Sequence, residues 1–159
     1  MEASRKAARV LLLAAGFAAL FGGLAGVVAW GSIAAAYELA YGDGGATRGH
    51  TAVLVGVGLA VAAAGCCLYA ADRLRFGRRG PAWITCALLV AGLAPAVFGG
   101  GTILAPRIAG AGAGSMEIGA DVAALAPRWY VPVTAGLAVF AMCAAILVAM
   151  LIAVPQRES

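Results

Sequence analysis

Four long apolar stretches, each without a charged residue in its central part, constrain the fold of this 159-residue chain more than any other feature. They cover residues 10–35, 51–71, 82–104 and 130–154. An α-helix needs about 20 mostly apolar residues to cross the roughly 30 Å hydrocarbon layer of a membrane. Backbone polar groups inside that layer must be satisfied within the segment, so we expect helices there. Hydrophobic residues make up 64% of the chain, a proportion that excludes an ordinary soluble domain.

The sequence therefore predicts an all-α integral membrane protein, in which a bundle of four transmembrane helices forms a single membrane domain. The expected connections are an outer loop at 36–50, a cytoplasmic loop at 72–81 and a second outer loop at 105–129. The basic start before residue 10 also resembles a secretory signal. The apolar core of a signal is usually only about 7–15 residues long, so the longer run here favours a retained helix.

The positions of Lys and Arg predict the orientation, because basic residues collect in cytoplasmic loops. With the N-terminus inside, eight of the eleven basic residues lie on the cytoplasmic side: Arg5, Lys6, Arg9, Arg73, Arg75, Arg78, Arg79 and Arg157. Both termini should then be cytoplasmic. The net charge of +4 reflects this topology and an affinity for anionic lipid, and we expect no nucleic-acid partner. The preference for Arg over Lys and the wealth of Ala and Gly indicate a GC-rich bacterial source and a bacterial cytoplasmic membrane.

A short sequence motif of the second apolar stretch recurs in the fourth. When residues 53–63 are aligned with 131–141, seven of eleven positions are identical. Residues 15–23 resemble 91–100 at nearly the same offset. A duplication would give two parallel two-helix repeats, as in some transporters. Similar lipid-facing composition would produce the same sequence matches without duplication, and both interpretations remain open.

Small residues recur at four-residue spacing in these stretches and allow helix backbones to approach closely. The sequence assigns helix packing to Gly22, Gly26, Gly58 and Gly136, and the first two could alternatively mark a dimer face. Pro95 should kink or loosen the third helix and is the candidate hinge, since a glycine run follows it. Trp30, Phe98 and Phe140 are expected on the outer surface, against lipid or a partner.

No span carries an ionisable residue in its central part, which argues against a proton-coupled transporter. His50, the only histidine, could form a dyad or metal site with nearby acids: Glu38, Asp43, Glu117 and Asp121. A solvated histidine is the simpler interpretation. No phosphate-binding loop, zincin helix or nucleophile elbow is present.

Three cysteines share a depth near the cytoplasmic side: Cys66, Cys67 and Cys86. Thiolates at one level could hold a soft ion such as Cu(I), with Cys143 a turn or two away. The chain has no CxxC pair, and buried cysteine commonly acts as a small apolar residue. We therefore expect no metal and no cofactor, and keep these three thiols only as candidates.

Three functions fit the sequence. The first is a non-catalytic accessory or scaffold subunit of a larger membrane complex, with the lipid bilayer and a larger membrane protein as its partners. The second is an oligomeric carrier or pore for a small or lipidic substrate, with the chain as a homo-oligomer. The third is an enzyme, or a thiol- or metal-binding membrane protein. Short loops, small-residue helix faces and the lack of embedded charge favour the first.

Overall fold

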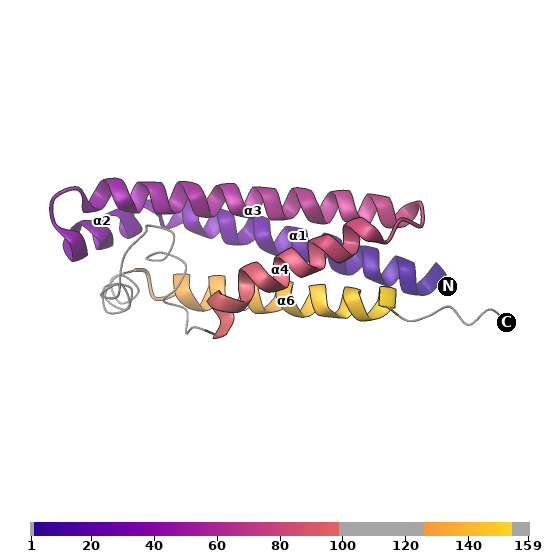
Figure 1. The fold of residues 1–159 in the computed structure, drawn as a ribbon. Helices are drawn as coiled ribbons and strands as arrows, with labels where there is room; N and C mark the ends of the chain where they lie inside the picture. The colour runs from indigo at the N-terminus through magenta and orange to yellow at the C-terminus, as the bar shows by residue number, and fades with distance from the viewer. Residues whose placement is uncertain (1, 99–125, 154–159) are drawn as a thin grey trace.

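The computed structural model describes residues 2–98 and 126–153, without the side chains of residues 40 and 95–98. Within these ranges every regular element is an α-helix (Figure 1). The helices are α1 (Glu2–Val28), α2 (Trp30–Tyr41), α3 (Gly45–Arg75), α4 (Gly80–Phe98) and α6 (Tyr130–Ala153). Three of them, α1, α3 and α6, are long and apolar enough to cross a membrane, and α4 contributes a shorter apolar stretch, Gly80–Ala94. The helical, membrane-embedded character expected from the sequence is therefore present.

Alanine, the best helix former, is abundant throughout the helices, and glycine occurs in the turns on either side of α3. Gly42, Gly44 and Gly77 adopt positive φ angles of 67°, 84° and 76°, a region in which a side chain would be strained. Pro81 lies in the first turn of α4, where its missing N–H has no helical partner to lose. These positions set the turns at 42–44 and 76–79.

Two expected boundaries differ from the helix ends in the structure. The first apolar stretch, expected as one helix over 10–35, bends at Ala29, whose φ and ψ of −84° and 1° separate α1 from α2. Hydrogen bonds still run through the bend, from Ala29 N–H to Ala25 and from Ile33 N–H to Ala29. The expected outer loop at 36–50 is mostly helix, with only the turn at 42–44 between α2 and α3. Polar residues ended the apolar run there, but Glu and Arg remain good helix formers.

Antiparallel helices run along a common long axis (Figure 1). α1 packs against α3 and α6, and α4 packs against α6 and, less extensively, α3. The start of α1, the turn after α3 and the end of α6 lie at one end, which we call the basic end because residues 2–9 and 72–79 lie there (Figure 1). α2, the start of α3 and Trp129–Tyr130 lie at the other, which we call the aromatic end.

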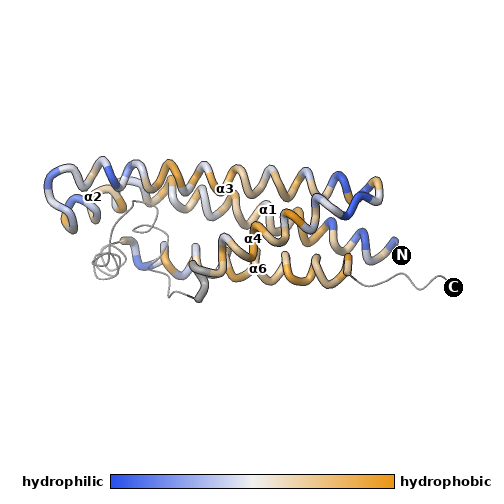
Figure 2. Tube along the Cα trace, viewed as in Figure 1, coloured by the Kyte–Doolittle hydropathy of each residue, from blue (hydrophilic) through white to orange (hydrophobic). Residues whose placement is uncertain are grey.

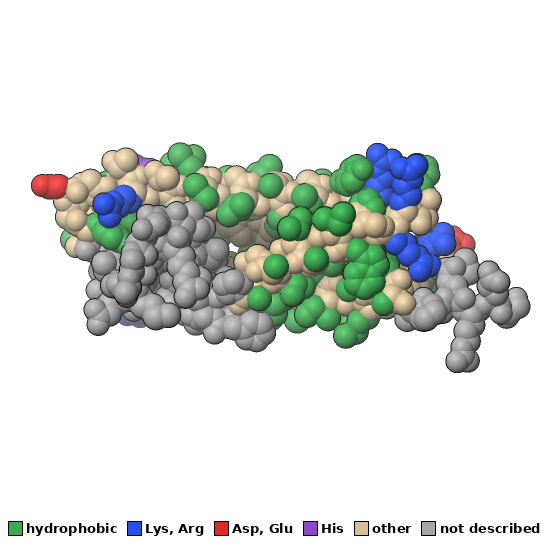
Figure 3. Space-filling model, viewed as in Figure 1, with side chains coloured by type: hydrophobic (Ala, Val, Ile, Leu, Met, Phe, Trp, Pro, Cys, Tyr) green, Lys and Arg blue, Asp and Glu red, His purple; other side chains and the backbone are tan. Residues whose placement is uncertain are grey.

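The chemistry of the surface follows the same long axis. Hydrophilic residues gather toward the two ends and hydrophobic residues occupy the length between them (Figure 2). In the space-filling view, apolar side chains spread over the middle of the molecule, and most of the Lys and Arg seen lie at the basic end (Figure 3). This distribution suits helices that enter a membrane along their axes.

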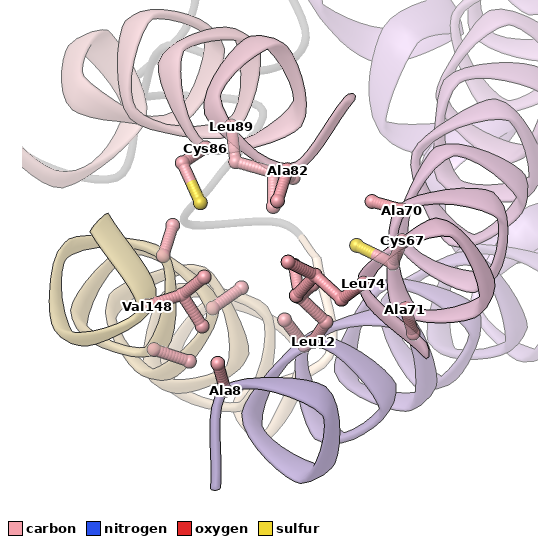
Figure 4. Close-up of a cluster of buried hydrophobic side chains, with 14 of the residues drawn as sticks. Ala8, Leu12, Cys67, Ala70, Ala71, Leu74, Ala82, Cys86, Leu89 and Val148 are labelled. Carbon is pink, nitrogen blue, oxygen red and sulfur yellow. The ribbon is translucent and has the colours of Figure 1, made fainter. Parts of the chain in front are cut away.

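The interior is built from small side chains in two clusters. The main cluster joins α1, α3, α4 and α6 and contains many alanines, with Leu12, Leu74 and Val148 as its largest fully buried members (Figure 4). The second, at the aromatic end, contains Ile33, Tyr37 and Val53. Small residues allow the close backbone contact that holds helices together where lipid removes the hydrophobic driving force.

Each helix pair of the suggested repeat does pack together, α1 with α3 and α4 with α6. The contacts between the pairs differ, because α1 packs extensively on α6 whereas α3 touches α4 much less. The two pairs are therefore not placed equivalently within the described residues. The duplication itself, and the crossing of the membrane by α4, remain predictions, since residues 99–104 of the expected span lie outside the described ranges.

Candidate functional site

The three candidate thiols do not converge on one point. Cys67 of α3 and Cys86 of α4 are buried in the main core, where their side chains point inward from different helices (Figure 4). Cys66 is exposed on the outside of α3, and Cys143 is exposed on α6. No group of three or more metal-ligating side chains occurs within residues 2–98 and 126–153. Cys67 and Cys86 thus occupy the positions of small apolar residues.

His50 lies near the start of α3 and pairs with an aromatic ring. The Trp30 indole N–H donates a hydrogen bond to Nδ1 of His50, and the two ring centroids are 5.9 Å apart. A histidine that accepts at Nδ1 in its neutral form carries its proton on Nε2. Glu38 and Asp43 are exposed nearby in the chain, whereas Glu117 and Asp121 lie outside the described residues. The observed partner of His50 is therefore Trp30, and this bond joins α2 to α3.

Tyrosines dominate the interior of the aromatic end. Tyr37 is fully buried and stacks on Tyr41, with ring centroids 5.6 Å apart, and Arg48 lies over the Tyr41 ring at 5.1 Å. Burial, with smaller contributions from Tyr41 and Tyr130, raises the pKa of Tyr37 above its ordinary range. The hydroxyls of Tyr37 and Tyr41 are buried without a hydrogen-bond partner among the described residues. A buried hydroxyl of this kind costs stability and keeps the phenol neutral.

The closest helix approaches lie at glycines that the sequence analysis did not select. An added Cβ at Gly49 would lie 2.8 Å from Cα of Ala34, and one at Gly45 would lie 2.8 Å from Cα of Glu38. On α1, a Cβ at Gly23 would lie 3.0 Å from Cβ of Ala60, and one at Gly16 would lie 3.1 Å from Cβ of Cys67. Gly45 and Gly49 form a GxxxG pair inside the range expected from the sequence as an outer loop, residues 36–50.

The glycines that were selected mostly face away from the neighbouring helices. At Gly22, Gly58 and Gly136 an added Cβ would meet no described atom within 4 Å. At Gly26 it would meet only the Tyr130 hydroxyl and a Val53 methyl group, at 3.9 and 4.0 Å. Against the described residues, Gly22, Gly58 and Gly136 therefore make no close helix contact, whereas Gly26 is buried on α1 with ordinary contacts. The role of these four glycines in helix packing stays a prediction. Packing against another molecule, the alternative raised for Gly22 and Gly26, remains a prediction.

Two further expectations concern α4 and the outer surface. α4 continues through Pro95 to Phe98, so the proline lies inside the helix, but the side chains of residues 95–98 lie outside the described part, including Phe98. Phe140 is 48% exposed, as expected for an outward residue. Trp30 is only partly exposed because it contacts His50 and the core of the aromatic end.

Taken together, the described residues present no convergent set of catalytic or metal-binding groups. What they do present is a tightly packed apolar bundle with an aromatic end and a basic end. No family model matches the chain, and neither the curated proteins nor the solved structures include one that is significantly similar.

Proposed function

We propose that this chain is a non-catalytic membrane protein that acts as an accessory or scaffold subunit of a larger bacterial membrane complex. The observation that carries the proposal is the division of its side chains between interior and surface. Among the described residues, Thr85 is the only buried residue of a polar type, and its hydroxyl donates a hydrogen bond to the Cys66 carbonyl at 3.4 Å. The other buried groups that can donate a proton are the Tyr37 phenol and the Cys67 and Cys86 thiols, which lie in two different core clusters. An interior of this kind supplies packing and gathers no set of catalytic groups in the described part of the chain.

The outer surface gives such a subunit what it needs for contact with lipid or a larger protein. Large apolar side chains point outward from α1, α3, α4 and α6, among them Phe17, Phe21, Leu59, Leu88 and Phe140. Phe17 and Phe21 lie one turn apart on α1, at 60% and 58% exposure. The open positions of Gly22 and Gly58 lie on the outer surface too and would let a partner helix approach closely. These features support the proposal without identifying the partner.

The alternative of a carrier or pore requires a polar path for its solute. Within residues 2–98 and 126–153 a single buried threonine does not supply one, so a carrier built on these helices would have to form its path between copies. The scaffold and carrier proposals therefore differ in the assembly that each requires. In the proposed topology, four helices cross the cytoplasmic membrane and both termini are cytoplasmic, in agreement with the basic end.

The assembly formed in the native host tests this proposal. We would extract the tagged full-length chain into polymer nanodiscs and determine the mass and composition of the intact complex. A larger membrane protein present in a fixed ratio is the expected result. A homo-oligomer with no second protein would overturn the proposal, and reconstituted flux measurements on that oligomer would then test the carrier.

Photo-crosslinking identifies the surface involved. A photoreactive phenylalanine analogue at Phe21, Leu59 or Phe140 samples the exposed faces of α1, α3 and α6, and all three positions tolerate a large outward side chain. A scaffold should give a discrete product with the same partner from one face and none from the others. Equal, diffuse labelling from all three positions would indicate lipid alone and contradict a protein partner.

A further inference from the structure

The basic end gathers cationic side chains from two separate segments of the chain. Residues 2–9 and 72–79 contain seven basic residues and two acidic ones, Glu2 and Asp72. Glu2 is paired with Lys6, at 2.8 Å between carboxylate oxygen and Nζ. The basic residues are Arg5, Lys6 and Arg9 at the start of α1, Arg73 and Arg75 at the end of α3, and Arg78 and Arg79 in the following turn. This end is therefore strongly cationic.

Several of these arginines are held in place by the backbone. Arg9 Nε donates a hydrogen bond to the Ala71 carbonyl at 3.2 Å, and Arg79 Nη1 donates one to the Ile152 carbonyl at 3.1 Å. Ile152 lies in the last turn of α6, where carbonyls lack helical partners, and Ala71 lies one turn before the end of α3. Arg5 reaches across to the turn, with Nη1 3.7 Å from the place of a Cβ at Gly77. A guanidinium has five N–H groups, so these contacts leave donors for an anion.

Arg73 adds a second, independent observation. Its guanidinium carbon lies 4.9 Å from the centre of the Tyr69 ring, and its Nε is buried without a hydrogen-bond partner among the described residues. A buried guanidinium nitrogen without an acceptor is costly. Arg73 as a whole is only partly buried, so its guanidinium is open to an oxyanion from outside. Arg75 and Arg78 are exposed on either side of Phe76 and Gly77 in the sequence and add positive charge at the same end.

The surroundings of the cationic groups are amphipathic. Tyr69, Phe76 and Trp83 are 53%, 69% and 43% exposed, and aromatic rings of this kind prefer the headgroup layer. Farther along α3 and α4 lie exposed aliphatic side chains, Leu68, Ile84 and Leu88. Phosphate suits the planar guanidinium fork, and acyl chains suit the aliphatic surface. A phospholipid carries both a phosphate and acyl chains.

We propose that the basic end binds the headgroup phosphate of an anionic phospholipid, with Arg75 and Arg78 as the exposed phosphate ligands and Arg73 beneath them. The acyl chains lie along the outer faces of α3 and α4. This assignment does not depend on a protein partner, so it stands or fails separately from the scaffold role. Clusters of basic residues beside transmembrane helices attract anionic headgroups, and each exposed arginine contributes measurably.

Native mass spectrometry of the purified full-length chain tests the assignment. Phosphatidylglycerol and phosphatidylcholine would be titrated separately, because they differ in net charge at similar chain length. The Arg75→Gln/Arg78→Gln variant removes the exposed cations. Its matched control, Arg48→Gln/Arg128→Gln, removes two exposed arginines at the aromatic end. All four side chains are exposed, so the variants should keep the fold, which unchanged thermal unfolding would verify.

The expected result is tighter binding of phosphatidylglycerol than of phosphatidylcholine. The Arg75→Gln/Arg78→Gln variant should lose about tenfold or more in phosphatidylglycerol affinity, and the control should not. The Arg75→Lys/Arg78→Lys variant should recover part of the loss, because it restores charge but not the planar fork. Equal affinity for both lipids, or equal loss in the control, would overturn the proposal. Displacement of the lipid by millimolar inorganic phosphate would instead assign the site to free phosphate and also overturn it.

Discussion

At the scale of single residues, the contact between α2 and α3 depends on two glycines. A Cβ at Gly49 would lie 2.8 Å from the backbone of Ala34, which cannot move without shifting α2. We expect Gly49→Ala to destabilise the protein by about 1–3 kcal/mol, as overpacking does. Gly58→Ala is the control, because its Cβ would meet no described atom within 4 Å and should cost nothing or add up to about 1 kcal/mol of helix stability. Unfolding by detergent titration measures both, and equal effects would contradict the observed packing.

Tyr37 provides a second residue-scale prediction, because its buried hydroxyl lacks a partner among the described residues. Tyr37→Phe removes that polar group while keeping the ring that stacks on Tyr41. The variant should be as stable as the parent at pH 7, or more stable by up to about 1 kcal/mol. A clear loss of stability would show that the hydroxyl has a partner after all.

Tyr37→Phe should also change how the unfolding free energy falls at alkaline pH. Burial raises the folded-state pKa of Tyr37 above its ordinary value of 10.0, so the unfolded chain releases this proton first. Stability contributed by the neutral phenol is present below about pH 10 and is lost as the pH rises above it. Unfolding free energies between pH 8 and pH 11 should fall less steeply for Tyr37→Phe than for the parent. Identical slopes of unfolding free energy against pH for the two proteins would show that the ionisation of Tyr37 is not responsible for the loss of stability at high pH.

At the scale of helices, substitutions at two adjacent glycines on α1 distinguish packing within the chain from packing against other molecules. A Cβ at Gly23 would lie 3.0 Å from Ala60 of α3, whereas one at Gly22 would meet no described atom within 4 Å. Gly23→Leu should therefore destabilise the α1–α3 contact by about 1–3 kcal/mol. Gly22→Leu should leave the isolated chain as stable as before or slightly more stable.

Thermal unfolding of the two purified variants in the same detergent compares them directly. A lower unfolding temperature for Gly22→Leu than for Gly23→Leu would contradict the orientation of α1. If Gly22→Leu also removed a copurifying protein from nanodiscs, the loss would place that protein on the open face of α1. The two effects are separable because one is measured on the isolated chain and the other on the complex.

The contrast between Gly22 and Gly23 also shows why the sequence predicts where helices lie better than it predicts which residues make contacts between them. Apolar length predicts helical, membrane-type segments, since the cost of an unsatisfied backbone in lipid leaves few alternatives. A run of Ala, Gly and Val has no strong polar face, so the sequence does not reveal that Gly23, and not Gly22, faces α3. Gly45 and Gly49 lie in the range expected as an outer loop, because apolar length predicts the membrane-spanning part of a helix and not how far the helix continues beyond it.

The candidate site was less predictable than the fold. The equal depth of Cys66, Cys67 and Cys86 follows from counting residues along helices, but their directions depend on how each helix is rotated about its own axis. Cys66 and Cys67 differ by about 100° around α3, so one is exposed and the other is buried. The Trp30–His50 bond lies directly after the bend at Ala29, and nothing in the Ala-rich sequence indicates that bend.

At the scale of the whole molecule, the topology can be tested by labelling single cysteines from one side of the membrane. The background would carry alanine in place of all four native cysteines, which are either buried among small residues or exposed on the outer surface. Ala3→Cys and Arg78→Cys report on the basic end, whereas Asp43→Cys and Arg128→Cys report on the aromatic end; all four positions are exposed. A membrane-impermeant maleimide added to intact cells should label only the second pair.

This pattern also tests the fourth crossing. Arg78 and Arg128 lie on either side of α4 and the residues that follow it, so labelling from opposite sides requires that this part of the chain crosses the membrane. Permeabilised cells should label all four positions, which controls for reactivity. Labelling of Arg78→Cys and Arg128→Cys from the same side would contradict four crossings. Labelling of Ala3→Cys from outside would reverse the orientation inferred from the basic residues and would place the lipid-binding arginines in the outer leaflet.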